Sequence, residues 1–332
     1  MRILVVGDVI DDVLVRAAGP VRPDTDTAAR IDRRAGGSAA NVAAWLGTLG
    51  GDVDFVGTVG REDADRHRTE LESCGVRALL HGSDEPTGAI VLVVDGETRT
   101  MYTQRGANRL TSPASVPSEL LGTAAHLHLT GYSLFGEDRD AWRRLLGTAR
   151  SAGITTSVDP SSASFLADTG VAEFVALTES VDVLLPNLDE GRLLTGLSEP
   201  ADIADALLAR HRVVALTLGA AGAEVRARGQ EGGRVPAAPA PGGLVDPTGA
   251  GDAFAAGFLS ATLRGLPVRD RLRHGHLLAA AALTAAGDLA APPAREHADR
   301  LAALDDAAWG RLRLGPGWTD DTQRAPEEVR TP

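Results

Sequence analysis

Residues Asp246–Phe258 read DPTGAGDAFAAGF and join a flexible glycine loop to an acidic side chain. Gly249, Ala250 and Gly251 can expose backbone N–H groups at the start of a helix, and such groups bind anions such as phosphate. Asp252 places a carboxylate at the same point, where a phosphate alone would repel it. A magnesium ion, or the hydroxyl group of a second substrate, would remove that conflict.

This arrangement fits phosphoryl transfer to an alcohol. Asp252 would accept the proton of the attacking hydroxyl, while the amides of the glycine loop stabilise charge on the transferred group. The alternative is that Asp252 only caps the helix, a role worth about 1 kcal/mol. The loop by itself leaves both interpretations open.

The absence of lysine excludes several other phosphate-handling mechanisms. The chain has 33 basic residues other than histidine, and all of them are arginine. The phosphate-binding loop GxxxxGK[ST], the protein-kinase lysine and Schiff-base chemistry all need an amine. A phosphate site in this chain must therefore use backbone amides, arginine or a metal ion.

Composition sets broader limits. A chain of 332 residues, of which 43% are hydrophobic, can bury a large core in one large domain or two moderate ones. A net charge of −12 opposes binding to nucleic acid. No apolar run reaches membrane-spanning length, and the opening MRILVVGDVIDD turns acidic too early for a secretory signal. The expected compartment is the cytoplasm, with no nucleic-acid or membrane partner.

Short apolar runs bounded by glycine alternate with helical patterns along most of the chain. The expected strands are buried parallel ones, and they cover residues 2–7, 53–57, 126–131, 154–159, 182–187 and 213–219. The expected helices cover residues 38–49, 63–74, 138–153, 187–196 and 201–211. This alternation predicts a doubly wound, mostly parallel α/β sheet with helices on both faces.

A different pattern interrupts the alternation. Residues 86–106 alternate apolar and polar side chains around Asp95-Gly96, which predicts a β-hairpin. Together with residues 13–34 this hairpin would form a small β-sheet outside the main sheet. The predicted α/β domain covers residues 1–308, and residues 309–332, rich in proline, glycine and charge, are expected to form a loose tail.

Ligands of open α/β sheets bind where strands end, so the residues after each strand are candidates. They are mainly acidic residues, an amide and glycines, namely Asp8, Asp11, Asp12, Asp159, Asn187, Glu190, Gly219, Gly222 and Asp252. Carboxylates beside a phosphate cradle favour a bound magnesium ion.

A second motif, AGGSAANVA at 35–43, gives these candidates a common context. Together with DPTGAGD, it resembles the two signatures of the ribokinase-like carbohydrate kinases of the phosphofructokinase B type. The resemblance extends over roughly residues 2–301. It implies that Asp252 is the catalytic base, and that Gly249, Ala250 and Gly251 form the anion hole.

The resemblance also implies a nucleotide side of the site. Asn187 and Glu190 match a motif that holds magnesium indirectly, through water, and the phosphates of ATP. Thr217, Gly219 and Gly222 match a segment near the nucleotide. Asp246 and Thr248 match a loop that binds a monovalent cation in some members, which implies activation by potassium.

On the sugar side, the resemblance implies that Asp12 grips sugar hydroxyls and that Gly36, Gly37 and Asn41 form a wall of the site, with Asp159 as a further substrate residue. Asp8 and Asp11 are interpreted as solvated or structural neighbours. In the family the small β-sheet is a lid that closes over the sugar and often pairs with another subunit, so a homodimer is expected. Tyr102 and Arg105 in this lid are equally candidates for touching the substrate or for solvated positions.

The resulting prediction is an ATP- and magnesium-dependent kinase that phosphorylates a hydroxyl, preferably a primary one, of a small sugar. The sequence lacks the glutamate that ribokinases proper place near Thr130 or Gly131, which argues against strict ribose recognition. Two alternatives stay open: a nucleoside kinase that uses Val13, Val15 and Tyr102 around a base, and a non-catalytic, sugar-binding regulator.

Overall fold

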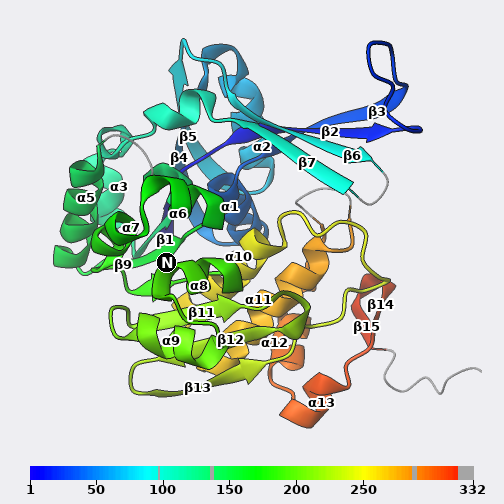
Figure 1. Cartoon of the computed structure of the whole chain (residues 1–332). Coiled ribbons are helices and arrows are strands. Elements are labelled where there is room, and N and C mark those ends of the chain that lie inside the picture. Colours follow the sequence, from blue (N-terminus) through cyan, green and yellow to red (C-terminus); the bar gives the residue numbers. More distant parts are fainter. Residues whose placement is uncertain (96–97, 135–137, 286–289, 321–332) are drawn as a thin grey trace, which may run out of the picture. The chain divides into compact units, whose positions relative to one another are not determined.

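The computed structural model describes residues 1–95, 98–134, 138–285 and 290–320 (Figure 1). The chain divides into two compact units, Met1–Leu184 and Leu185–Pro332. Each unit has its own buried apolar core.

The first unit is built on parallel strands that run in the order β10-β9-β8-β1-β4-β5. Their bounds are β1 (Arg2–Val6), β4 (Asp52–Gly60), β5 (Val76–Ser83), β8 (His126–Thr130), β9 (Thr155–Asp159) and β10 (Val183–Leu184). Nearly every residue of β1, β4 and β8 is buried, as the continuous apolar runs of the sequence predict for strands covered on both faces. The edge strand β5, whose charged and polar residues dilute its apolar pattern, was not predicted.

Helices connect these strands. They are α1 (Ser38–Thr48), α2 (Ala64–Ser73), α3 (Ser118–Thr123), α4 (Gly131–Leu134), α5 (Arg139–Ser151), α6 (Ala163–Thr169) and α7 (Val171–Thr178). From β1 the chain proceeds through β4 to β5 in one direction, and then from β8 to β10 in the other. The strand order therefore reverses between β1 and β8, and this switch point is where open α/β sheets bind their ligands.

A second, four-stranded sheet belongs to the first unit and corresponds to the predicted lid. Its strands β2 (Ile10–Ala17), β3 (Ala29–Gly36), β6 (Gly88–Asp95) and β7 (Thr98–Gln104) lie in the order β3-β2-β6-β7. The hairpin partners β6 and β7 are antiparallel, as are β2 and β3, whereas β2 and β6 are parallel. Gly96, in the predicted turn, lies outside the described residues.

The second unit contains a small sheet with helices packed on it. Its strands are β11 (Val213–Thr217), β12 (Ala223–Ala227) and β13 (Gln230–Val235), which pair antiparallel in that order. Its helices are α8 (Leu188–Thr195), α9 (Pro200–Leu208), α10 (Ala250–Leu263), α11 (Val268–Ala282), α12 (Arg295–Ala302) and α13 (Asp306–Gly310). In the described parts of the chain, no helix combines the length and the apolar character that crossing a membrane requires.

Helices α10 and α11 approach each other closely because each carries a glycine at the contact. A Cβ atom on Gly257 would lie 2.5 Å from the carbonyl oxygen of His274, and one on Gly275 would lie 2.8 Å from the ring of Phe254. Only glycine leaves room for this contact, which fixes the helix that begins at the glycine loop.

The segment expected to be a loose tail is packed where the structure describes it. Trp309, Leu312 and Leu314 are buried, and the indole Nε1 of Trp309 donates a 2.9 Å hydrogen bond to the carbonyl oxygen of Pro236. Residues 314–315 and 319–320 form the short strand pair β14 and β15. The prolines and glycines of this segment predicted a loose tail, although three of its apolar residues enter a core. Residues 321–332 lie outside the described residues.

Candidate active site

The glycine loop begins helix α10, as predicted. Gly249 is the N-cap residue and has a φ of 74°, in the left-handed region that glycine adopts without strain. Asp252 lies in the first turn of α10 and is half-buried. The helix dipole and the first-turn N–H groups favour negative charge at this end, so the loop can bind an anion and stabilise the Asp252 carboxylate.

Asn187 and Glu190 come together at the start of α8 in a reciprocal capping box. The Asn187 side chain accepts a 3.0 Å hydrogen bond from the Glu190 N–H, and the Glu190 carboxylate accepts bonds of 2.9 Å from the Asn187 backbone N–H and 2.7 Å from its side-chain amide. A β-bridge links Asn187 to Thr217 at the end of β11. Three residues predicted for the nucleotide side therefore lie next to one another in the second unit.

Burial gives Glu190 unusual acid–base behaviour. Its side chain is 1% exposed. Burial raises the pKa of Glu190 to about 7, although the hydrogen bonds from Asn187 act in the opposite direction. A carboxyl group that titrates near neutrality can release its proton when a cation binds nearby.

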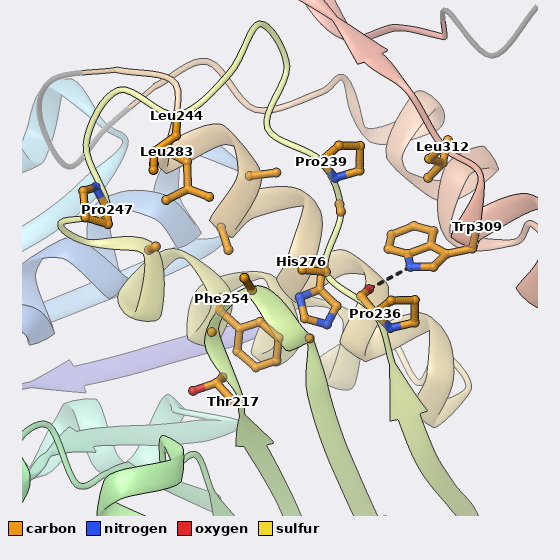
Figure 2. Close-up of a pocket in the computed structure, with 18 of the residues that line it drawn as sticks. Thr217, Pro236, Pro239, Leu244, Pro247, Phe254, His276, Leu283, Trp309 and Leu312 are labelled. Atoms are coloured by element: carbon orange, nitrogen blue, oxygen red, sulfur yellow. Dashed lines mark hydrogen bonds between the residues drawn. The ribbon is translucent and has the colours of Figure 1, made fainter.

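A cavity of about 630 Å³ opens beside the glycine loop in the second unit (Figure 2). Five of the predicted residues line it, namely Thr217, Gly219, Gly222, Ala250 and Gly251. A Cβ atom on Gly222, whose φ is 97°, would overlap the backbone at Val235 and Pro236. At this point the cavity wall is therefore formed by two backbone segments in close contact, with no side chain between them.

The rest of the cavity wall was not predicted, and most of it is apolar. It includes Pro236, Pro239, Phe254, His276 and Trp309. The His276 ring packs edge-on to Phe254 with centroids 5.2 Å apart, and its Nε2 lies 3.2 Å from the carbonyl oxygen of Val235. Burial lowers the pKa of His276 to about 4, so the ring is neutral at pH 7. A neutral, apolar wall next to an anion loop fits a molecule with a flat ring at one end and phosphate at the other.

Asp246 and Thr248 form a closed turn before the glycine loop. The buried Asp246 carboxylate accepts hydrogen bonds from the Thr248 N–H at 3.0 Å and from its hydroxyl at 2.7 Å. In the described parts of the chain, no cluster of three or more histidine, cysteine, aspartate or glutamate side chains is placed to hold a metal ion. The two hydrogen bonds hold this turn closed.

In the first unit, Asp12 lies on β2 of the lid beside the AGGSAANVA motif. A Cβ atom on Gly36 would overlap the Asp12 carboxylate, and one on Gly37, whose φ is 105°, would lie 2.7 Å from the carbonyl oxygen of Asp8. Asn41 is buried in the first turn of α1. The two glycines therefore allow the chain to pass directly under Asp12, so these predicted sugar-side residues do come together.

Asp8 has a structural role at the switch point, one of the two interpretations made from the sequence. Its Oδ2 accepts a 2.7 Å hydrogen bond from Ser38 N–H, and its Oδ1 accepts bonds from Ala39 N–H at 3.2 Å and from the Thr130 hydroxyl at 2.8 Å. Asp8 thus holds the start of α1 against the end of β8. Asp159, at the end of β9, accepts a 2.7 Å bond from the Ser161 N–H.

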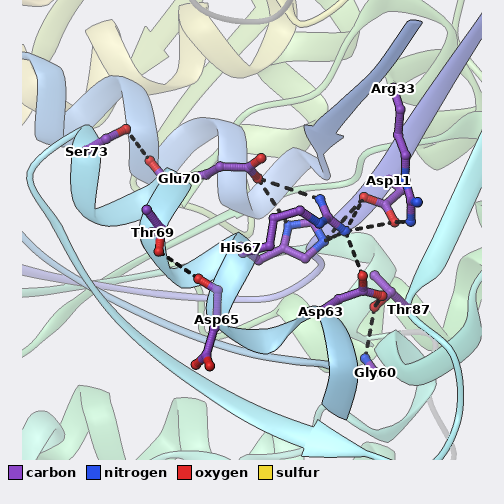
Figure 3. Close-up of polar contacts among 11 residues, drawn as sticks. Asp11, Arg33, Gly60, Asp63, Asp65, His67, Thr69, Glu70, Ser73 and Thr87 are labelled. Carbon is purple, nitrogen blue, oxygen red and sulfur yellow. Dashed lines mark hydrogen bonds and ion pairs between the residues drawn. The ribbon is translucent and has the colours of Figure 1, made fainter. Parts of the chain in front are cut away.

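Asp11 is structural too, and it joins the lid to helix α2 (Figure 3). Its carboxylate is buried and forms ion pairs with Arg33 of β3 and, at 2.8 Å, with Arg66 of α2. His67 is fully buried and lies 3.4 Å from the same carboxylate, and burial lowers the pKa of His67. This Asp11 network, which consists of Asp11, Arg33, Arg66 and His67, fixes β2 at the residue next to Asp12.

The doubly wound sheet, the four-stranded lid and the glycine loop beside a cavity together define a ribokinase-like α/β fold. The chain belongs to the pfkB family of carbohydrate kinases, because the sequence model of that family matches residues 1–295. It is therefore a carbohydrate kinase, as predicted from the two motifs.

The similar proteins include enzymes with different sugar substrates. A 2-dehydro-3-deoxygluconokinase of Bacillus subtilis is 32% identical over 277 residues, which cover 78% of this chain and 84% of that protein. An ATP-dependent ribose-1-phosphate kinase of Halopiger xanaduensis is 32% identical over 309 residues, 89% of this chain and 96% of that protein. A putative ribokinase II from E. coli, solved with ATP and Mg²⁺, has a TM-score of 0.76 at 22% identity, over 86% of this chain and 94% of that chain.

Proposed function

We propose that this protein transfers the γ-phosphoryl group of ATP to a hydroxyl, preferably a primary one, of a small sugar. The observation that carries the proposal is the position of Asp252, one residue after a glycine loop that lines a cavity. Asp252 accepts the proton of the sugar hydroxyl as it attacks. The backbone amides of Gly249, Ala250 and Gly251 hold the transferred group in line and stabilise its charge.

The cavity of the second unit takes the nucleotide in this proposal. Its apolar wall of prolines, Phe254 and Trp309 receives the base, and Thr217, Gly219 and Gly222 lie toward the phosphates. The donor set of Asn187 and Glu190 fits Mg²⁺, because the ion prefers oxygen ligands and retains waters through which such residues can hold it. When bound, Mg²⁺ neutralises charge on the phosphates.

The sugar lies at the switch point of the first unit in this proposal. The Asp12 carboxylate accepts hydrogen bonds from sugar hydroxyls, and Asn41 offers a side-chain amide from the first turn of α1. Gly36 and Gly37 let the backbone pass close to Asp12 and Asp8, because side chains there would collide with these residues. Asp159 adds an acceptor at the end of β9.

The test is ADP formation by the purified protein with a panel of pentoses, hexoses, sugar acids, sugar phosphates and nucleosides. Asp252→Asn should lower kcat by at least about 1000-fold and leave ATP binding intact. Asp270→Asn is the matched control, because Asp270 is the acidic residue in the first turn of the next helix, α11. This control should retain full activity.

The panel separates the alternatives. Turnover confined to nucleosides would favour a nucleoside kinase, in which Tyr102 and the lid valines contact the base. Sugar binding without ADP formation would favour the regulatory protein. Full activity of Asp252→Asn would reduce Asp252 to a helix cap.

Potassium activation and dimerisation through the lid are further parts of the proposal. The Asp246 turn lies directly before the glycine loop, so an ion bound there would set the loop's position. Measuring kcat in KCl and in NaCl at equal ionic strength tests this activation.

Ile31, Met101 and Tyr102, on the outer strands β3 and β7, are 63–67% exposed, which supports a partner on the lid. Sedimentation of the wild type and of Tyr102→Glu tests the dimer. We place the ATP-consuming reaction in the cytoplasm.

A further inference from the structure

Arg273 of α11 is a buried cation, 1% exposed, to which the proposed mechanism gives no role. Its Nη1 donates a 3.0 Å hydrogen bond to the carbonyl oxygen of Ala302 and a second bond to that of Leu304. Its Nη2 donates a 2.6 Å bond to the carboxylate of Asp306. Ala302 ends α12, where backbone carbonyls lack partners within the helix, so the guanidinium satisfies acceptors that the helix itself cannot.

The same guanidinium packs on Trp309. Its carbon lies over the indole, 4.9 Å from the ring centre, which is within the range of a cation–π contact. On the cavity side, the indole Nε1 bonds to the carbonyl oxygen of Pro236, directly after β13 (Figure 2). Trp309 and Pro236 line the cavity, whereas Arg273 does not. Arg273 therefore supports the cavity wall from behind.

The supported wall lies beyond residue 295, where the match to the pfkB family ends. We call residues 302–313 the wall segment, because Trp309, Gly310, Leu312 and Arg313 of this stretch line the cavity. Arg269, one turn before Arg273 on α11, reaches the segment only through a 3.2 Å ion pair with the exposed Asp306 side chain. Arg273 is thus the buried anchor of the segment on α11.

We infer that Arg273 is a positioning residue for the nucleotide: it holds the wall segment against α11, so that Trp309 closes the cavity in which ATP is proposed to bind. This inference rests on the proposed function. A buried guanidinium is costly to leave unpaired, and the acceptors that the structure describes for Arg273 all lie in the wall segment. Burial lowers the pKa of Arg273, which reflects the same cost. Moving the segment away from α11 would leave this cation without its partners, so the segment stays in place.

The test is calorimetric titration with Mg-ATP in the absence of sugar, so that it does not depend on turnover. Arg273→Gln should raise the Kd for ATP at least about 10-fold, because it removes the charge, the fork of donors and the cation–π contact. Arg273→Lys should give an intermediate Kd, because it returns the charge without the fork. Arg271→Gln is the matched control: Arg271 is half-buried on the same helix and donates a 2.6 Å bond to the carbonyl oxygen of Leu266. This control should bind ATP like the wild type.

A double-mutant cycle separates positioning from a general loss of structure. If Arg273 acts through Trp309, a variant that combines Arg273→Gln with Trp309→Leu should bind ATP within about 2-fold of Trp309→Leu alone. Independent effects would multiply instead. If Arg273→Gln does not fold, Asp306→Asn takes its place, because the Asp306 side chain is 78% exposed and can be changed without opening the core. It should raise the Kd for ATP about 3-fold.

Two outcomes overturn the inference. One is that Arg273→Gln, or Asp306→Asn in its place, binds ATP as tightly as the wild type. The other is a combined variant whose loss of affinity equals the product of the two single losses, which would show that Arg273 does not act through Trp309. Failure of the proposed function alone looks different: Mg-ATP binds in the predicted way, yet no ADP forms with any acceptor of the panel. A wild type that binds no Mg-ATP would overturn both.

Discussion

At Glu190, burial and hydrogen bonding act in opposite directions on one carboxyl group, and burial prevails. The folded protein raises the Glu190 pKa from 4.5 to about 7. It therefore binds this proton more tightly than the unfolded chain does. The resulting stabilisation is fully present below pH 4.5 and is lost as the pH rises through 7.

Glu190→Gln should remove this dependence, because glutamine resembles the protonated acid. The two proteins should be about equally stable at pH 4.5, and the variant should be more stable at pH 8 by on the order of 3 kcal/mol, since each pKa unit corresponds to about 1.4 kcal/mol. Urea unfolding across this range measures it. Asp189→Asn, an exposed neighbour in the same helical turn, is the control. If the free energy of unfolding of Glu190→Gln changed between pH 4.5 and pH 8 as much as that of the wild type, the prediction would be contradicted.

Among the elements, β8 carries two buried histidines, and their effect on stability has the opposite pH dependence to that of Glu190. His126 and His128 are two residues apart, and both lie within 2.8 Å of the Ser157 hydroxyl on β9. Burial lowers the pKa of His126 to about 4 and that of His128 to about 3. Because these folded-state values lie below the unfolded value of 6.5, the histidines' contribution to stability is present above pH 6.5 and is lost as the pH falls.

His128→Leu should flatten the acid side of the stability profile. The variant removes one buried group that must stay neutral, so its free energy of unfolding should fall less than that of the wild type between pH 6.5 and pH 4. Urea unfolding at these two values gives the difference. The control is His81→Leu, at an exposed position on β5. Its free energy of unfolding should fall as much as that of the wild type. Parallel pH profiles for all three proteins would refute the assignment.

The Asp11 network links two elements, the lid and helix α2. Arg66→Gln removes one ion pair from the buried Asp11 carboxylate and should lower the free energy of unfolding by about 1–3 kcal/mol. Because Asp12 is the next residue on β2, the KM for the sugar should rise more than kcat falls. Arg68→Gln, which breaks only the exposed pair with Asp65, is the control. A sugar KM equal to that of the wild type would show that β2 keeps its position without Arg66.

For the molecule as a whole, the two compact units allow their functions to be perturbed separately. Trp309 lines the cavity of the second unit that is proposed to hold the nucleotide, and its indole lies 4.9 Å from the Arg273 guanidinium carbon. Trp309→Ala should cost about 3–5 kcal/mol of stability and weaken ATP binding. Trp142→Phe, at a buried tryptophan of the first unit, should leave ATP binding unchanged. Calorimetric titration of both variants with ATP makes the comparison, and equal affinities would remove Trp309 from the site.

What the sequence could predict was local. The glycine-bounded strands, the glycine loop and the Asn187–Glu190 box follow from neighbouring residues, so their positions were predicted correctly. The edge strands β5 and β13, and β12 between β11 and β13, were missed because charged and polar residues interrupt their apolar pattern. The pairs Arg66–Asp11 and Trp309–Pro236 join residues 55 and 73 positions apart, and no local periodicity encodes such contacts.

The position of Trp309 along the chain also has a consequence for synthesis. The glycine loop ends at Gly251, and the tryptophan that closes the cavity wall follows 309 − 251 = 58 residues later. At ribosomal speeds these residues take about 3–12 s to make. Through that interval the nascent second unit has its glycine loop but lacks one wall of its cavity. A nucleotide that binds in this cavity, as proposed, can therefore contribute little to the folding of the second unit until Trp309 has been synthesised.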